Sequence, residues 1–499
     1  MAGASAVRLD ATLWEVPPSA RSDMRVPARV FADAELFEAI ARDGALEQLQ
    51  NVATLPGVRG AVLAMPDAHH GYGFPVGGVA ATELPDGAVS PGGVGYDINC
   101  GVRLLALPLS EPELGARREP LVEELARTIP AGTGGTRRDR QPADLDAVLR
   151  DGPAAFGARD DDLEHTESGG RLPGADPAAV SPRARERAKG QLGTMGAGNH
   201  FVELQRVARV YDERTAAGFG LSADQVVVLI HSGSRGLGHQ VCTDYVERMG
   251  PAMRRHGITL PDRQLACAPA SSPEGRQYLA AMAAAANFAW ANRQLIADSV
   301  RAAVAKVLGR AMAEGTRQVY DVAHNIAKPE RYGGRELLVH RKGATRAFPA
   351  GSPEIPAAYR ELGQPAFIPG SMGTSSFVLA GEPGSLERSF GSICHGAGRA
   401  LSRTAARRRK TGAEVRRELE SRGIVVRSTS PTRTSSASSR SSSAPGSPAA
   451  SPSSSRSASS RADRPRGKPR GRRGEGRVCA RPRVCDGWHR LPPGSRRQR

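Results

Sequence analysis

In the stretch Ser90-Pro-Gly-Gly-Val-Gly-Tyr-Asp97-Ile-Asn-Cys100-Gly-Val-Arg103, a glycine-rich turn leads to two side chains that can bind a metal ion. Glycine lets the backbone approach a bound group closely. Asp97 and Cys100 are three residues apart, so both side chains can face one ion from a tight loop or a helical turn. Residues 101–107 are mostly apolar and are typical of a strand. The stretch therefore predicts a metal site beside a strand.

A second glycine-rich stretch, Gly193-Thr-Met-Gly-Ala-Gly-Asn199-His200-Phe-Val-Glu203, ends in the same kind of ligand. Three further histidines have similar neighbours: His231 in His-Ser-Gly-Ser-Arg, His324 in Asp-Val-Ala-His-Asn and His395 in His-Gly-Ala-Gly-Arg. A thiolate, a carboxylate and imidazoles suit Zn, Mn, Fe or Co better than Mg or Ca. One such motif is a weak signal, but five in one chain indicate a metal site that also holds phosphate.

Apolar runs place two of these histidines at the ends of strands. Residues 225–230 predict a buried strand that delivers His231, and residues 318–322 predict a strand that ends next to His324. Residues 335–340 repeat this pattern. Rigid strands can aim the side chains at their ends, so the candidate site residues are expected at strand ends and in loops.

Helices are expected in three regions. Residues 277–313 are rich in Ala, Leu, Met and Arg at helical spacing and predict one long helix or two. A shorter helix is expected near residues 32–49, and the polar residues 135–190 predict an excursion with helices on the surface. Together with the strands, these regions predict an α+β fold of mixed sheets flanked by helices.

The motifs resemble, in the same order, the signature blocks of the RtcB-type RNA-splicing ligases. The resemblance runs from about residue 30 to about residue 427. The matching blocks are Pro66-Asp-Ala-His-His-Gly-Tyr-Gly-Phe-Pro-Val-Gly-Gly78, Asp97-Ile-Asn-Cys100-Gly-Val-Arg, Gly198-Asn199-His200-Phe-Val-Glu203, His231-Ser-Gly-Ser-Arg-Gly, Asp321-Val-Ala-His324-Asn, Val339-His-Arg-Lys-Gly-Ala-Thr-Arg-Ala-Phe-Pro349, Pro369-Gly-Ser-Met-Gly-Thr374 and His395-Gly-Ala-Gly-Arg399.

The resemblance implies a GTP- and Mn-dependent RNA ligase that acts in tRNA splicing or RNA repair. Such an enzyme joins an RNA 3′-phosphate or 2′,3′-cyclic phosphate to a 5′-hydroxyl through a guanylylated histidine. The implied partners are RNA, namely tRNA halves or broken RNA ends, GTP, and an archease-like activator. The chain has no Walker A sequence, so GTP is not expected to bind as it does in P-loop enzymes.

The resemblance also assigns roles to individual residues. Cys100 is expected to bridge two Mn²⁺ ions, with Asp97 and His200 on one ion and His231 and His324 on the other. His395 is expected to be the nucleophile that takes GMP. The residues implied to line the nucleotide are Asn199, His200, Phe201, Val202, Glu203, His324, Asn325, Pro369, Gly370, Ser371, Met372, Ser376, His395, Gly396, Ala397 and Gly398.

Ordinary structural roles compete with these assignments. A lone cysteine after a glycine-rich turn is often a small buried apolar residue, and His395 could simply cap a helix. Arg235 could be solvated rather than grip an oxyanion. Two other functions stay open: a two-metal RNA cyclic phosphodiesterase, which needs the same ligands but not His395, and an inactive RNA-binding remnant, because the C-terminus is altered.

The positive charge is concentrated at the C-terminus. Residues 431–499 hold 17 Lys and Arg residues against three acidic ones, a net +14 of the chain's +18. This Arg/Ser/Pro-rich segment has almost no aliphatic content, so it predicts a disordered tail after a catalytic domain at residues 1–430. The family's guanine-closing segment, with an Ala-Tyr-Lys block and a lysine next to the C-terminus, has no counterpart here. An out-of-frame reading of a GC-rich gene and a disordered RNA-binding tail both explain the composition.

The rest of the composition points to a cytoplasmic enzyme. Six widely spaced cysteines do not form a disulfide framework. The sequence contains no apolar run of about 18 to 20 residues, the length that spans a membrane. Its first 36 residues have no apolar segment after a basic start, so no signal peptide is expected.

Overall fold

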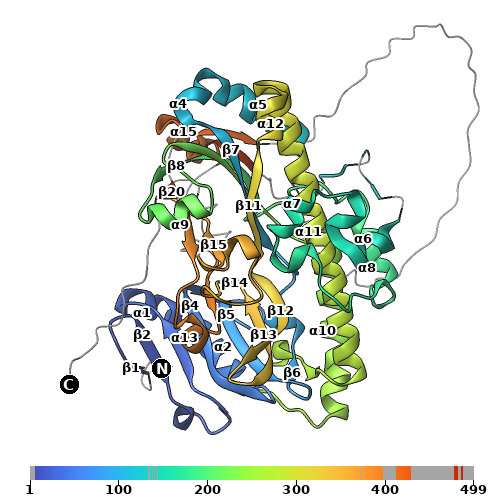
Figure 1. Cartoon of the computed structure of the whole chain (residues 1–499). Coiled ribbons are helices and arrows are strands. Elements are labelled where there is room, and N and C mark those ends of the chain that lie inside the picture. The colour runs from blue at the N-terminus through green and yellow to red at the C-terminus, as the bar shows by residue number, and fades with distance from the viewer. Residues whose placement is uncertain are drawn as a thin grey trace, which may run out of the picture.

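Two large β-sheets and one long helix form the framework of the protein, seen here in a computed structural model (Figure 1). The structure describes residues 6–132, 135–137, 139, 141–142, 144–371, 374–396, 412–428, 477–480 and 485–486. The sheets are mostly antiparallel and helices pack beside them, so the predicted α+β class is confirmed.

The first sheet has seven strands in the order β1-β2-β3-β4-β5-β13-β12. Its only parallel pair is β3 with β4, and the other neighbours are antiparallel. The strands are β1 (Val7–Arg8), β2 (Leu13–Val16), β3 (Ala28–Phe31), β4 (Val58–His69), β5 (Val76–Glu83), β12 (Asn325–Tyr332) and β13 (Arg335–Lys342).

The second sheet runs in the order β11-β7-β9-β8-β19-β18, and β20 also pairs with β8. Its central strands β7, β9 and β8 are antiparallel, whereas β19 and β20 join β8 in parallel. The strands are β7 (Gly101–Ser110), β8 (Phe201–Arg209), β9 (Gln225–Ser232), β11 (Arg317–Ala323), β18 (Val425–Ser428), β19 (Arg477–Ala480) and β20 (Cys485–Asp486). The strands predicted at residues 101–107, 225–230, 318–322 and 335–340 are thus confirmed as β7, β9, β11 and β13.

The predicted disordered tail falls mostly outside the described residues. Of residues 431–499, only β19 and β20 are described, and both extend the second sheet at β8. Just before this segment, α15 (Gly412–Ser421) leads into β18.

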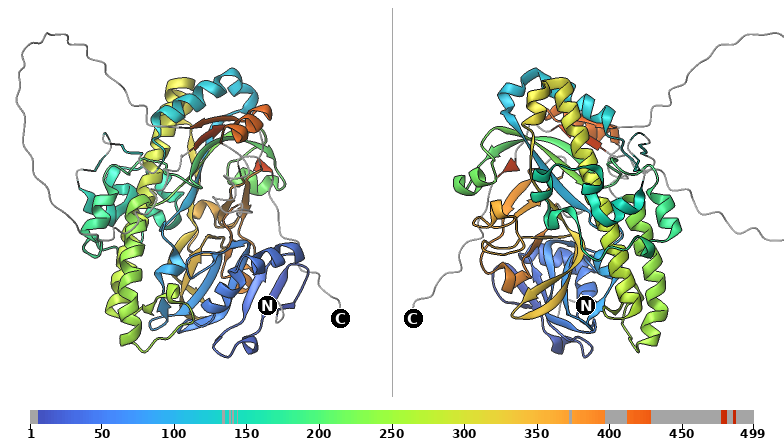
Figure 2. Two further views of the ribbon diagram at one scale, coloured as in Figure 1. Left: turned by 180° about the vertical axis from the view of Figure 1, so that it is seen from behind. Right: turned by 45° about the vertical axis from the view of Figure 1, so that its right-hand side comes forward.

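Helix α11 (Pro273–Leu308) is the longest helix described and lies alongside both sheets (Figures 1 and 2). The Ser272 hydroxyl caps it by accepting a hydrogen bond from the Gly275 N–H at 3.0 Å. It ends at Gly309, whose φ of +102° suits glycine, and α12 (Arg310–Glu314) follows. The prediction of one long helix or two over residues 277–313 is therefore confirmed.

The helix expected near residues 32–49 is in fact two helices, α1 (Ala34–Arg42) and α2 (Ala45–Val52). Asp33 caps the first by accepting from the Leu36 N–H, and Gly44 separates the two with a φ of +83°. The other helices and strands described are β6 (Ala88–Val89), α3 (Pro91–Val94), α4 (Glu111–Leu114), α5 (Arg118–Thr128), α6 (Leu145–Asp151), α7 (Asp160–Glu164), α8 (Pro182–Ala188), α9 (Glu213–Gly218), α10 (Arg235–Arg255), β10 (Ala268–Pro269), β14 (Ala344–Arg346), β15 (Pro365–Ile368), β16 (Phe377–Ala380), α13 (Ser385–Ser389) and β17 (Ser392–Cys394).

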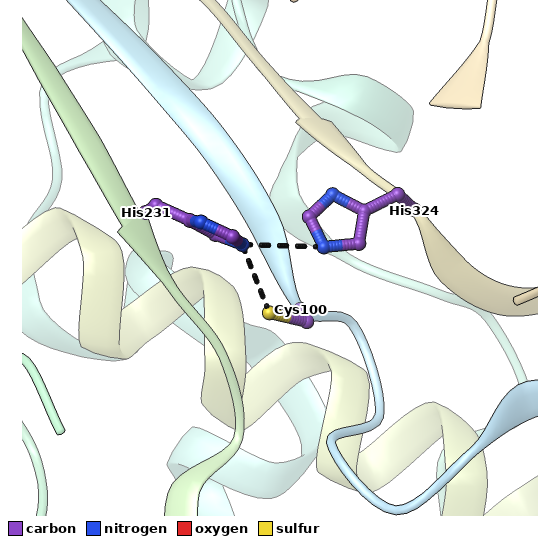
Figure 3. Close-up of side chains that lie close together, drawn as sticks. All are labelled: Cys100, His231 and His324. Atoms are coloured by element: carbon purple, nitrogen blue, oxygen red, sulfur yellow. Dashed lines mark hydrogen bonds between the residues drawn. The ribbon is translucent and has the colours of Figure 1, made fainter. Parts of the chain in front are cut away.

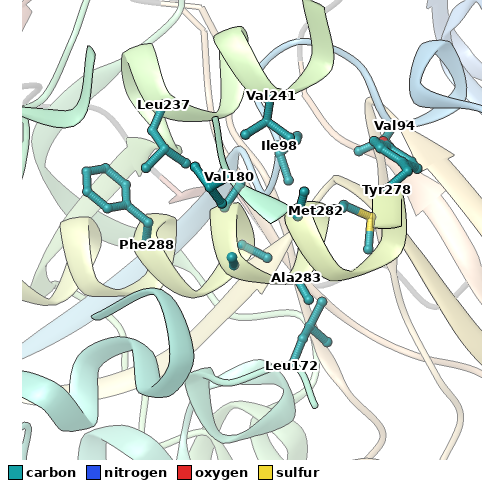
Figure 4. Packing of buried hydrophobic residues seen from close by; sticks show 14 of the residues in the cluster. Val94, Ile98, Leu172, Val180, Leu237, Val241, Tyr278, Met282, Ala283 and Phe288 are labelled. Carbon is teal, nitrogen blue, oxygen red and sulfur yellow. The ribbon is translucent and has the colours of Figure 1, made fainter. Parts of the chain in front are cut away.

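The second sheet has a buried layer on each face because its side chains alternate along every strand. On β7, Leu105 and Leu107 pack toward α5 and α11, whereas Leu104 and Ala106 pack toward the opposite layer. Helix α11 also packs against α10, and Val241 of α10 and Met282 of α11 belong to the same buried cluster (Figure 4). None of the helices among the described residues is both long and apolar enough to cross a membrane.

The packing of α11 can be tested with a cavity. Phe288 is fully buried on this helix, so Phe288→Ala is expected to lower the free energy of unfolding by about 3–5 kcal/mol. Leu36→Ala is the control, because Leu36 is 41% exposed, and it should change stability by less than about 1 kcal/mol. Chemical denaturation measures both. Equal losses in the two variants would contradict the assignment of α11 to the core.

Candidate metal and nucleotide site

Neighbouring strand ends of the second sheet bring four of the predicted metal ligands together. Cys100 immediately precedes β7, His200 immediately precedes β8, and His231 is the penultimate residue of β9. His324 is the single residue between β11 and β12, and its N–H donates to the Cys100 carbonyl at 2.8 Å. Because these strands are adjacent and in register, the four side chains meet at one end of the sheet. Figure 3 shows three of them, Cys100, His231 and His324.

The ligand atoms form two groups that share the cysteine. Cys100 Sγ lies 3.3 Å from His200 Nε2 and 3.3 Å from His231 Nε2. His231 Nε2 lies 3.3 Å from His324 Nε2, and His200 Nε2 lies 2.8 Å from Asp97 Oδ2. In each group, Cys100–His231–His324 and Asp97–Cys100–His200, the ligand atoms lie within 4.8 Å of one another. The two groups are the two ligand sets that the family resemblance implies.

The protonation of these groups suits metal binding. Burial lowers the pKa of His231 and His324 well below the ordinary value, so both imidazoles are neutral at pH 7. Burial alone would raise the pKa of Asp97, but His200, Cys100 and Arg235 lower it to about 2.

The same surroundings act against a thiolate at Cys100. Burial raises the pKa of its thiol and Asp97 raises it further, so a bound cation is what would make it a thiolate at neutral pH. His200 Nδ1 lies 3.0 Å from the Met195 carbonyl oxygen, which fixes the tautomer whose Nε2 lone pair faces Cys100 and Asp97. One sulfur, one carboxylate and three imidazoles therefore fit transition-metal ions better than Mg²⁺ or Ca²⁺.

A buried network of ion pairs fixes the backbone next to two of the candidate ligands. The two guanidinium groups of Arg103 and Arg293 both donate to the Asp321 carboxylate, with contacts of 2.7 Å from each. Arg293 also donates to the carbonyls of Asn99 at 2.7 Å and Ser232 at 2.9 Å, which adjoin Cys100 and His231. Sequence reasoning missed this network, although Asp321 and Arg103 both stand in motif blocks.

His395 lies beside the cluster and has a carboxylate partner. Its ring centroid is 5.0 Å from that of His324. Its Nδ1 lies 2.7 Å from Asp67 Oδ2, and the N–H groups of His395 and Gly396 donate to that oxygen at 3.0 and 3.2 Å. Asp67, on β4, belongs to the block Pro66–Gly78, but nothing in that block marks it as a partner of His395. The structure thus adds it as a candidate site residue that orients His395.

Some of the predicted nucleotide contacts lie around a short chain of hydrogen bonds. Gln205 Nε2 donates to Glu203 Oε2 at 2.6 Å and to Ser376 Oγ at 3.2 Å, and the Gly370 N–H donates to Ser376 Oγ at 3.1 Å. The loop that follows β15 reaches His395, because a Cβ at Gly396 would lie 3.0 Å from the Pro369 carbonyl oxygen. Ser371 is exposed at this loop, and Met372, Ala397 and Gly398 lie outside the described residues.

The remaining predicted contacts differ in their surroundings. Asn199 is exposed, and Phe201 packs edge-on against His231 with a centroid distance of 5.3 Å. The side chain of Val202 is fully buried in the core between the second sheet and α11. Asn325 donates to the Asp97 carbonyl at 3.0 Å and accepts from the Gly343 N–H at 2.8 Å, so it ties two site loops together.

Arg235, considered as an oxyanion ligand, lies next to Asp97 and is half-buried. Its Nε donates to Thr194 Oγ1 at 3.1 Å and its Nη2 to the Gly132 carbonyl at 3.2 Å. These hydrogen bonds hold the second glycine-rich stretch against α10. The Nε and Nη2 atoms of the guanidinium therefore have a structural role.

Comparison with known proteins gives independent evidence of the family to which the chain belongs. A family model described as tRNA-splicing ligase RtcB matches residues 48–439. The tRNA-splicing ligase RtcB of Thermococcus kodakarensis is 52% identical over 435 residues, covering 85% of this chain and 90% of that protein. The RNA-splicing ligase RtcB of Mycobacterium tuberculosis is 51% identical over 396 residues, covering 77% of this chain and 90% of its own. The resemblance seen in the sequence is therefore confirmed, and the chain belongs to the RtcB family of tRNA-splicing ligases.

Proposed function

We propose that this chain joins RNA 3′-phosphate or 2′,3′-cyclic phosphate ends to 5′-hydroxyl ends, with GTP as co-substrate and two manganese ions. The observation that carries the proposal is Cys100, which is shared by two ligand groups, one of which includes His324, the neighbour of His395. The work proposed for the enzyme is tRNA splicing or RNA repair in the cytoplasm, with an archease-like protein as activator.

The two ligand groups are the proposed metal sites. Asp97, Cys100 and His200 would hold one ion, and Cys100, His231 and His324 the other. Two cations at these positions would neutralise phosphate oxygens and lower the pKa of an attacking oxygen. The protein contributes the neutral histidines, the ionised Asp97 and the buried network that fixes the strand ends.

The proposed role of His395 is to attack the α-phosphorus of GTP through Nε2 and expel pyrophosphate. Asp67 Oδ2 lies 2.7 Å from Nδ1, so its negative charge would stabilise the positive charge that grows on the ring. The RNA 3′-phosphate then takes GMP from His395 as the N–P bond breaks. In the last step the 5′-hydroxyl attacks the activated 3′ end and GMP leaves.

Transfer of GMP to His395 gives a direct test. Incubation with α-labelled GTP and Mn²⁺ is expected to attach GMP to His395, and His395→Ala should lose all label because no other nucleophile is proposed. Peptide mass spectrometry locates the adduct. His256→Ala is the control, since His256 is exposed and directly follows the last turn of α10. GMP found on a lysine, or retained in His395→Ala, would refute the mechanism. An active cyclic phosphodiesterase without label would favour that alternative.

Metal content tests the shared cysteine. Cys100→Ala is expected to lose both ions and all ligation, because one thiolate serves both groups, whereas His324→Ala should lose chiefly one ion. Elemental analysis of the purified variants gives the number of ions per chain. Cys242→Ala is the matched control, because Cys242 is also fully buried but belongs to neither group. Normal metal content in Cys100→Ala would rule out the bridging role.

The C-terminal segment is expected to act through its charge. Removing residues 431–499 takes away a net +14, so the salt dependence of RNA affinity should flatten by about 0.7 in log–log slope for each RNA phosphate that the protein no longer neutralises. Guanylylation should be weak in both forms, because the family's guanine-closing tyrosine and lysine have no counterpart in this sequence. Titration of labelled RNA at several salt concentrations, with thermal unfolding as the control for folding, measures the effect. An unchanged slope would show that the segment does not bind RNA.

A further inference from the structure

The strand that leads to His395 is anchored to the first sheet by a buried ion pair outside the two metal-ligand groups. Glu330 lies on β12 and Arg341 on β13, and their side chains are 2% and 0% exposed. Arg341 Nη1 donates to Glu330 Oε1 at 2.6 Å, and Nη2 donates to Oε2 at 2.8 Å. This fork geometry fixes the guanidinium in one orientation.

The other donors of Arg341 reach the turn that precedes β17. Its Nη2 donates to the Phe390 carbonyl oxygen at 2.7 Å, and its Nε donates to Ser392 Oγ at 2.8 Å. The Ser392 hydroxyl in turn donates to the Phe390 carbonyl at 3.1 Å. The Tyr332 hydroxyl lies 3.0 Å from the same carbonyl oxygen and 2.7 Å from Glu330 Oε2. Several hydrogen-bond donors therefore surround the Phe390 carbonyl oxygen in the protein interior.

This turn needs such support because of its backbone conformation. Phe390 has a φ of +50° and is followed by Gly391 at +53°. A residue with a side chain rarely adopts this left-handed region, and it persists only where the surroundings hold it. Packing of the Phe390 ring also fixes the turn. The ring lies so close to Gly60 that a Cβ at Gly60 would be 2.9 Å from it.

One short strand connects the turn to His395. β17 pairs with β14 through Ser392, Ile393 and Cys394, and His395 follows directly. Each residue of a strand adds about 3.3 Å of length. A change in backbone direction at Phe390 would therefore move the imidazole that follows the far end of β17. A displacement of about 1 Å at a reacting atom can lower a rate about a hundredfold.

We propose that Arg341 and Glu330 are positioning residues for His395, which hold the Phe390 carbonyl and thereby aim the imidazole at the phosphorus that it attacks. This inference rests on the proposed guanylylation of His395. Lysine could keep the charge of Arg341 but not its planar set of donors, so it could not hold Glu330, Phe390 and Ser392 together.

The test compares Arg341→Lys with Arg301→Lys in the full-length chain with Mn²⁺. Arg301 is a matched control, because it forms a buried two-point pair with Asp162 at 2.6 and 2.7 Å, and its Nε donates to the Thr316 carbonyl at 3.2 Å rather than to the turn before β17. Single-turnover labelling with α-labelled GTP gives the maximal rate of guanylylation and the KM for GTP. Elemental analysis and thermal unfolding report metal content and folding.

Arg341→Lys is expected to lower the maximal rate about tenfold or more, with KM and metal content within about twofold of the wild type. Tyr332→Phe removes one polar neighbour of the Phe390 carbonyl and should lower the rate in the same direction by less. This milder variant keeps the test decisive if Arg341→Lys does not fold. An unchanged maximal rate in the folded variants, a loss confined to KM or metal content, or an equal rate loss in Arg301→Lys would overturn the proposal.

A second readout separates this inference from the proposed function. Diethyl pyrocarbonate modifies imidazoles without GTP, and peptide mass spectrometry gives the rate at each histidine. Arg341→Lys should change the rate at His395 and leave that at the exposed His256 unchanged. If the wild type takes no GMP, the proposed function fails, and the pyrocarbonate rates alone decide the positioning role. An unchanged rate at His395 in Arg341→Lys would then refute it.

Discussion

The carboxylate of Asp321 is the point on which the geometry of the candidate site depends. It is fully buried on β11 and accepts hydrogen bonds from Arg103 on β7 and Arg293 on α11. A buried charge that loses its partner costs about 3–5 kcal/mol, so the three side chains are bound to stay together. Because Arg293 also holds the carbonyls of Asn99 and Ser232, the position of the long helix is transmitted to the strand ends that carry the ligands.

The sequence was sufficient for the elements that carry local signals. The apolar run before His231 predicted β9, and glycine-rich turns marked the loops of Asp97 and His200. What it could not supply were partners contributed by distant segments. Arg293 lies within a helical pattern where a charged residue normally faces water, yet it is fully buried. Asp67 lies 328 residues from His395, and no pattern in the sequence indicates that the two are neighbours.

The same limit explains the unexpected burial within residues 135–190. This polar region was expected at the surface, and it does form short helices, but Asp162 and Glu167 are fully buried there. Asp162 pairs with Arg301 of α11, and Glu167 pairs with Lys328 of β12. Buried acidic residues require such partners, and the partners come from the two elements that the excursion covers. The sequence shows that these residues are acidic, but their burial depends on basic residues elsewhere in the chain.

His324 joins the two sheets as well as lying in the cluster. It is the single residue between β11 of the second sheet and β12 of the first. Asn325, next to it, accepts from the Asn99 N–H through its carbonyl at 2.7 Å, so the crossing point is also bonded to the loop before Cys100. An insertion or deletion of one residue here would reverse the facing of every side chain along one of the strands. The length of this junction is therefore fixed by both sheets at once.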